Sequence, residues 1–133
     1  MGIYSSKIKR ISYKDVQDSI KRDSVCIINT MSPTDQNCLI KHTIHANDEE
    51  TIINNILTSN KHTHIIVYGK HSCDDTIYVK YDTLTKLGFQ NVSLYIGGLF
   101  EWLCLQDIYS DTFFPTSSKC LEILDYAPGK FNL

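Results

Sequence analysis

A short polar loop at residues 69–74 holds the side chains best suited to chemistry. It follows an apolar run at residues 64–68 and precedes a helical pattern, so its backbone N–H groups are expected at a helix N-terminus, where anions bind. A cysteine there, close to basic side chains, favours the thiolate and can act as a nucleophile. The six loop residues are Gly69, Lys70, His71, Ser72, Cys73 and Asp74. Cys73 is therefore the candidate catalytic residue.

Two acidic residues, Asp74 and Asp75, directly follow Cys73 and argue against this chemistry. Their negative charges disfavour a neighbouring thiolate. Carboxylates at a helix N-terminus also accept its free N–H groups and cap the helix. We therefore expect the loop to bind anions weakly or not at all, with Lys70 and His71 as solvated side chains.

The other histidines and cysteines show no spacing typical of a metal site. His62 and His64 alternate into a predicted strand, and the five cysteines include no Cys-x-x-Cys pair. We therefore predict no metal site, no cofactor and no disulfide framework. Scattered, unpaired cysteines favour a reducing compartment and hence a cytoplasmic protein. Of the remaining cysteines, Cys26 and Cys104 lie in apolar runs and are expected to be small core residues.

The composition is that of one globular domain. The chain has 133 residues, a formal net charge of −2 and 42% apolar residues. A near-neutral chain without a concentrated basic face is not expected to bind nucleic acid. No apolar run reaches the roughly 18 residues of a membrane span.

The N-terminus fits the N-myristoylation pattern, with Gly2 as the acceptor and Ser6 at the required position. The basic residues Lys7, Lys9 and Arg10 would strengthen binding to an anionic membrane. The alternative is an unstructured and unmodified N-terminus. We expect membrane association only through this acylation.

Strand and helix patterns alternate along the chain. Three short apolar runs, at residues 25–28, 64–68 and 92–96, are typical of buried parallel strands, and residues 43–44 form a very short one. Helical patterns cover residues 12–20, 48–57, 74–86 and 99–105. This order predicts an α/β fold, with a mostly parallel central sheet flanked by helices on both faces. We expect a flexible N-terminus at 1–10, a domain at 11–116, and a C-terminal extension at 117–133 that packs on the domain or trails from it.

Single residues carry further expectations. Gly88 is the natural C-cap of the helix before it, and Trp102 is expected to pack the last helix onto the sheet. Tyr109, Phe113 and Phe114 either cover the end of the sheet or form an exposed patch for a partner.

Three segments in this order resemble the rhodanese family: Ile65-Ile-Val-Tyr68, Leu87-Gly-Phe-Gln-Asn-Val92, and Tyr95-Ile-Gly-Gly98 followed by Trp102. The resemblance covers about residues 11–116. It implies a loop whose first residue is a cysteine that carries a persulfide, cradled by backbone N–H groups and closed by a basic residue. It also implies an Asp at the end of the first core strand and an Arg two residues later.

This sequence departs from the family pattern at all four of these positions. The loop begins with Gly69 and closes with Asp74, while Asn29 and Met31 replace the Asp and the Arg. We therefore expect a catalytically inactive rhodanese-like domain that binds or scaffolds a protein partner of unknown identity. The alternative is a thiosulfate or persulfide sulfurtransferase that uses Cys73 as the sulfur carrier.

Overall fold

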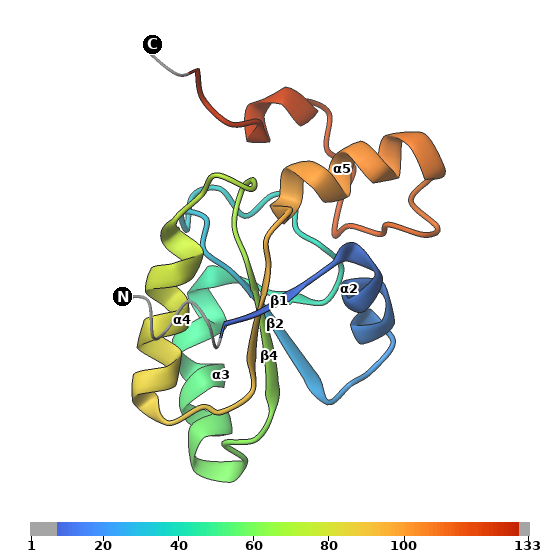
Figure 1. The fold of residues 1–133 in the computed structure, drawn as a ribbon. Helices are drawn as coiled ribbons and strands as arrows, with labels where there is room; N and C mark the ends of the chain where they lie inside the picture. Colours follow the sequence, from blue (N-terminus) through green and yellow to red (C-terminus); the bar gives the residue numbers. More distant parts are fainter. Residues whose placement is uncertain (1–7, 131–133) are drawn as a thin grey trace.

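The computed structural model describes residues 8–130, and these residues fold into one parallel sheet with helices on both faces (Figure 1). The predicted α/β fold is confirmed. The elements are β1 (Lys9–Ile11), α2 (Tyr13–Ile20), β2 (Val25–Asn29), β3 (Thr43–Ile44), α3 (Ala46–Ser59), β4 (His64–Tyr68), α4 (Thr76–Leu87), β5 (Val92–Tyr95), α5 (Gly98–Tyr109) and the 3-10 turn η1 (Ile123–Tyr126). Gly2 and its acylation pattern lie outside the described residues.

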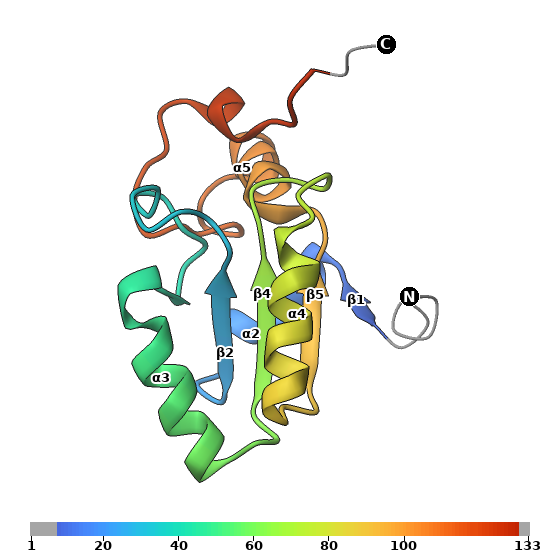
Figure 2. The same ribbon diagram turned by 90° about the vertical axis from the view of Figure 1, so that its left-hand side faces the viewer.

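The sheet has the order β1-β5-β4-β2-β3, with β4 at its centre. Side chains of a strand point alternately to the two faces, so each strand contributes to two cores. Ile65 and Val67 of β4 pack with residues of α3 and α4, whereas Ile66 and Tyr68 pack with residues of α2 and α5. Figures 1 and 2 show α3 and α4 together on one face of the sheet and α2 on the other.

The helix ends follow the local sequence. Ser12 and Asp15 form a capping box at the start of α2, because the Asp15 carboxylate accepts the Ser12 N–H and the Ser12 hydroxyl accepts the Lys14 N–H. Gly88 ends α4 in the left-handed conformation, with φ +113°, as predicted. Trp102 is fully buried between α5 and the sheet, which confirms its predicted role.

Several predicted boundaries were wrong. Lys9 and Arg10 belong to β1, which pairs with β5, although we expected residues 1–10 to be flexible. The helix α5 continues to Tyr109, and Cys104 on it is only partly buried, so Cys104 is not a core residue. Within the described part of the chain, no helix is long and apolar enough to span a membrane.

The C-terminal segment, defined here as residues 115–126, packs back on the domain. It pairs with the loop between β2 and β3, since the Lys41 N–H donates to the Pro115 carbonyl at 3.1 Å and the Ser117 N–H donates to the Leu39 carbonyl at 2.8 Å. A disulfide joins Cys38 of that loop to Cys120 of the segment. We expected no disulfide framework, and the structure contains this disulfide. The sequence did not reveal it because 82 positions separate the two cysteines.

Candidate functional site

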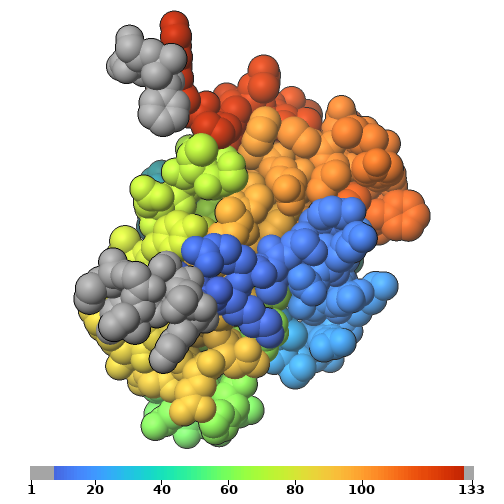
Figure 3. Space-filling model, viewed as in Figure 1, coloured from blue at the N-terminus to red at the C-terminus, as the bar shows by residue number. Residues whose placement is uncertain are grey.

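The loop 69–74, called the site loop below, connects β4 to α4 at the carboxyl end of the sheet, where ligands bind in open parallel sheets. The first turn of α5 holds this loop in place. The N–H groups of Leu99 and Phe100 donate to the carbonyls of Gly69 and Lys70 at 3.0 and 2.8 Å. Figures 1 and 3 show the loop directly beside the start of α5 and the C-terminal segment.

Gly98 makes this close approach of α5 and the loop possible. Its backbone has φ +71°, a left-handed conformation that favours glycine. A Cβ on Gly98 would lie 2.9 Å from both the Gly69 carbonyl oxygen and the His71 nitrogen. The position therefore accepts no side chain without movement of the loop backbone.

The Asp74 carboxylate accepts one N–H group of the site loop and one at the start of α4. Its Oδ2 accepts the Lys70 N–H at 3.0 Å, and its Oδ1 accepts the Thr76 N–H at 3.1 Å and the Thr76 hydroxyl at 2.6 Å. Asp75, in contrast, makes no capping hydrogen bond with its side chain. The sequence offered both acids as caps, and Asp74 alone takes that place.

The same carboxylate fills the space beside Gly69. A Cβ built on Gly69 would lie 2.6 Å from Asp74 Oδ2 and 3.0 Å from the Thr30 hydroxyl oxygen. A side chain at the first position of the loop and the present conformation of Asp74 are therefore incompatible. The Asp74 carboxylate therefore occupies the space beside the first position of the loop.

Hydrogen bonds lower the pKa of the Asp74 carboxyl. Burial on its own would raise this pKa, but the Thr76 hydroxyl, the N–H groups of Lys70 and Thr76, and the charge of His71 outweigh burial. The pKa therefore lies below its ordinary value. The ionised form of Asp74 is therefore more stable in the folded protein than in the unfolded chain, and its ionisation stabilises the fold.

We predict that Asp74→Asn destabilises the protein at neutral pH by about 1 kcal/mol, a value reduced for the partial exposure of the group. A lowered folded-state pKa gives stability that is present above the unfolded value of about 3.9 and is lost as the pH falls through the folded value. Urea unfolding at pH 7 and at pH 3 checks this, with Asp75→Asn as the matched control. An equal difference between wild type and Asp74→Asn at both pH values would contradict the role of the charge.

The other loop residues lie at the surface. Ser72 and Cys73 are exposed, and the His71 Nδ1 accepts the Cys73 N–H at 3.1 Å. Lys70 forms an ion pair with Asp35 at 3.6 Å, so this side chain is not simply solvated as the sequence suggested. The structure thus places Lys70, His71 and Cys73 on one exposed loop, with Lys70 bound to a neighbouring acid.

Gln36 is a residue of the site that the sequence did not reveal. It is buried and exchanges two hydrogen bonds with the buried amide of Asn29, at 2.8 and 3.0 Å. Asn29 Oδ1 also accepts the Met31 N–H at 3.0 Å, and Met31 packs in the core. Asn29 and Met31, which stand where the resemblance implies an Asp and an Arg, therefore brace the loop after β2 with neutral groups.

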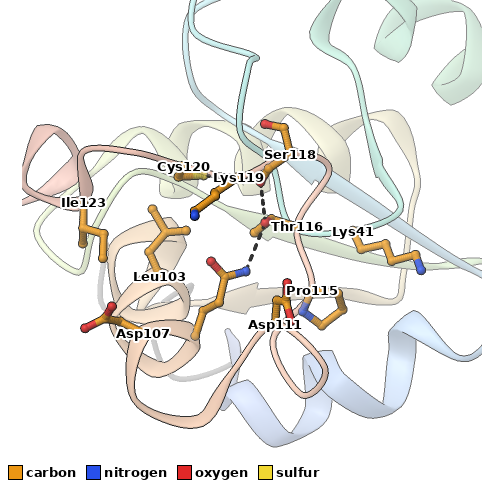
Figure 4. Close-up of a pocket in the computed structure, with 11 residues that line it drawn as sticks. Lys41, Leu103, Asp107, Asp111, Pro115, Thr116, Ser118, Lys119, Cys120 and Ile123 are labelled. Atoms are coloured by element: carbon orange, nitrogen blue, oxygen red, sulfur yellow. Dashed lines mark hydrogen bonds between the residues drawn. The ribbon is translucent and has the colours of Figure 1, made fainter.

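Two cavities lie near the carboxyl end of the sheet. One, of about 560 Å³, separates α5 from the C-terminal segment, and Figure 4 shows Lys119 and Cys120 opposite Leu103 and Asp107. The other, of about 480 Å³, lies between α3 and α4 and includes Thr30, Thr76 and the Glu49–Lys80 ion pair. Neither of these two cavities has a wall residue from the site loop.

Comparison with known proteins decides the family. The family model of the rhodanese-like domain matches residues 12–104. The chain belongs to the rhodanese-like domain family. The resemblance predicted from the segments around Gly88 and Gly98 is thereby confirmed. No curated protein matches this rhodanese-like domain in sequence.

Solved structures with the same fold include known sulfurtransferases. A protein from Anabaena sp. is 20% identical, with a TM-score of 0.62 over 87% of this chain and 83% of its own. The thiosulfate sulfurtransferase of Pseudomonas aeruginosa is 16% identical, with a TM-score of 0.60 over 76% of this chain and 20% of its own. A single-domain sulfurtransferase from Saccharomyces cerevisiae is 14% identical, with a TM-score of 0.55 over 81% of this chain and 96% of its own. At these identities the likeness shows that the rhodanese-like domain shares their fold.

Proposed function

We propose that this rhodanese-like domain is a binding or scaffolding module without sulfurtransferase activity. The observation that carries the proposal is the Asp74 carboxylate, which accepts the N–H groups of Lys70 and Thr76 and lies 2.6 Å from where a Gly69 Cβ would be. The resemblance to the family implies a nucleophilic cysteine at position 69 and a basic residue at position 74. Here both the nucleophile and the attraction for an anion are missing, because glycine and an acid occupy these positions.

Cys73 is the residue through which the alternative, a sulfurtransferase, would act. It is exposed, but it stands four positions after the first residue of the loop. The free thiols of Cys26 and Cys104 are less suited to attack. Burial, followed by the charge of Glu49, raises the pKa of Cys26 to about 11, and burial with the charges of Asp107 and Glu101 raises that of Cys104.

The proposal predicts negligible transfer of sulfur from thiosulfate to cyanide at neutral pH. The rate of the wild-type protein should equal that of Cys73→Ser, since neither has a thiolate inside the ring of loop N–H groups. A clear wild-type rate that disappears in Cys73→Ser would establish the alternative instead.

Restoring the pocket provides the positive arm of the same experiment. Asp74→Ala frees the N–H groups and removes a negative charge, so thiosulfate affinity in calorimetric titration should rise several-fold over the parent. Gly69→Cys alone places its side chain against Asp74, whereas Gly69→Cys combined with Asp74→Arg supplies both missing groups. We expect a measurable rate in the double variant only. Tight thiosulfate binding by the parent would contradict the proposed role of Asp74.

A further inference from the structure

The disulfide between Cys38 and Cys120 lies at the wall of a cavity. The two Cα atoms are 5.8 Å apart, a separation typical of disulfides. Cys38 is only 3% exposed, whereas Cys120 lines the cavity of about 560 Å³ between α5 and the C-terminal segment. The two sulfur atoms therefore differ in access, and a molecule in the cavity meets the Cys120 side of the bond.

Charged residues of both signs line this cavity. Lys41 and Lys119 provide ammonium groups, and Asp107 and Asp111 provide carboxylates. Figure 4 shows Lys119 next to Cys120, with Asp107 on the opposite wall. A small peptide that carries both carboxylates and an ammonium group matches such a wall, and the volume is in the range of small-molecule sites.

We propose that the Cys38–Cys120 disulfide is a site of reversible thiol–disulfide exchange with a small zwitterionic peptide thiol. The thiolate of the peptide attacks the Cys120 sulfur and forms a new S–S bond, while the Cys38–Cys120 bond breaks. Cys38 leaves as a thiolate and takes a proton from water. A second peptide thiol then attacks the mixed disulfide, which releases the peptide disulfide and leaves the Cys120 thiol. Two peptide thiols are thus oxidised, and one protein disulfide is reduced.

Backbone contacts make the exchange reversible. The hydrogen bonds of Lys41 to Pro115 and of Ser117 to Leu39 do not depend on the disulfide, and the Ser118 hydroxyl also donates to the Asn37 carbonyl. They keep the C-terminal segment, which carries Cys120, beside the loop that carries Cys38 after the bond opens. The peptide disulfide can then reform the mixed disulfide at Cys120, from which Cys38 displaces the peptide.

The part of the C-terminal segment that follows the disulfide adjoins the site loop. Asp35, the ion-pair partner of Lys70, is also near Tyr126, because its negative charge adds to burial in raising the pKa of the Tyr126 hydroxyl. The residues that follow Cys120 therefore reach the surroundings of the site loop. Exchange at Cys120 is a separate chemistry from sulfur transfer at that loop, and it stands whether or not the loop is inactive.

The test uses the full chain, purified without reductant and treated with glutathione. Acid quenching, alkylation and peptide mass spectrometry then locate the adduct. We expect a Cys38–Cys120 crosslink before treatment, and one glutathione on Cys120 but none on Cys38 after it. The Cys73→Ser background removes the exposed thiol from the count. The proposal would be overturned if Cys38 and Cys120 were both free thiols and stayed free in the presence of oxidised glutathione. It would also be overturned if the glutathione adduct formed on Cys38.

The contribution of the cavity is measured by rates. Lys119→Glu should slow the reaction with glutathione several-fold and leave the reaction with uncharged 2-mercaptoethanol almost unchanged, because only the former thiol carries carboxylates. Locating the glutathione adduct in the wild-type protein does not require any variant to fold. A disulfide that glutathione reduces only in the unfolded chain would show that the cavity gives no access, and the proposal would fail.

Discussion

Trp102→Ala is expected to lower the free energy of unfolding by about 3–5 kcal/mol, the range for removing a large buried aromatic side chain. Trp102 is 0% exposed, and its ring meets those of Tyr95 and Phe114 edge-on, with centroids 6.2 and 5.1 Å apart. Its Nε1 donates to the Pro115 carbonyl at 3.1 Å. The substitution therefore leaves a cavity and removes one of the hydrogen bonds that join α5 to the C-terminal segment.

Denaturant unfolding measures this effect, and two variants separate its parts. Trp102→Phe keeps most of the ring contacts but loses the Nε1 donor, so its loss should be intermediate. Phe113→Ala removes an aromatic ring that is 61% exposed and should change stability by no more than about 0.5 kcal/mol. A loss below about 1 kcal/mol in Trp102→Ala would mean that α5 is not anchored through this side chain.

Gly98→Ala should destabilise the protein by more than about 2 kcal/mol, because left-handed strain and a collision act together. The new Cβ would lie 2.9 Å from two backbone atoms of the site loop. These backbone atoms cannot move out of the way by a rotamer change, as the end of a flexible side chain can. The variant should therefore also weaken the hydrogen bonds from Leu99 and Phe100 to the loop, which hydrogen exchange detects.

Two other glycines provide matched controls. Gly88 shares the left-handed conformation but has only a lysine side-chain atom at 3.8 Å, so Gly88→Ala carries strain without collision. Gly129 has nothing within 4 Å of its Cβ position, and Gly129→Ala should be nearly neutral. We expect the losses to decrease in the order Gly98, Gly88, Gly129. Equal losses of unfolding free energy in Gly98→Ala and Gly88→Ala would show that the site loop moves to accept the Cβ without destabilising the protein.

Local patterns were sufficient to predict the core of this fold. The runs at 25–28, 64–68 and 92–96 are apolar because these strands are covered on both faces, and the strands appear there with shifts of one residue at their ends. The strand β1 was missed because it has three residues, two of them basic, at the edge of the sheet. An edge strand needs no continuous apolar run, so its sequence resembles that of a terminal tail.

The candidate site was predictable only where its chemistry is local. The acid at position 74 closes the loop just before the helix, so its capping role could be inferred, whereas the choice between Asp74 and Asp75 depends on the turn geometry. The pairing of Asn29 with Gln36 and the disulfide between Cys38 and Cys120 join residues that only the folded chain brings together. Phe114 is likewise buried against Trp102, while Phe113 and Tyr109 remain exposed, a difference that composition does not predict.

The pairing of β1 with β5 sets the order in which the chain can complete its sheet. Residues 9–11 find their partners at residues 93–95, so a ribosome must release most of the chain before this edge can close. Closing so long a loop early is entropically unfavourable, and a strand of three residues gains little from it. β1 is therefore expected to join last during synthesis and to leave first during local opening, while β4 and its neighbours stay paired.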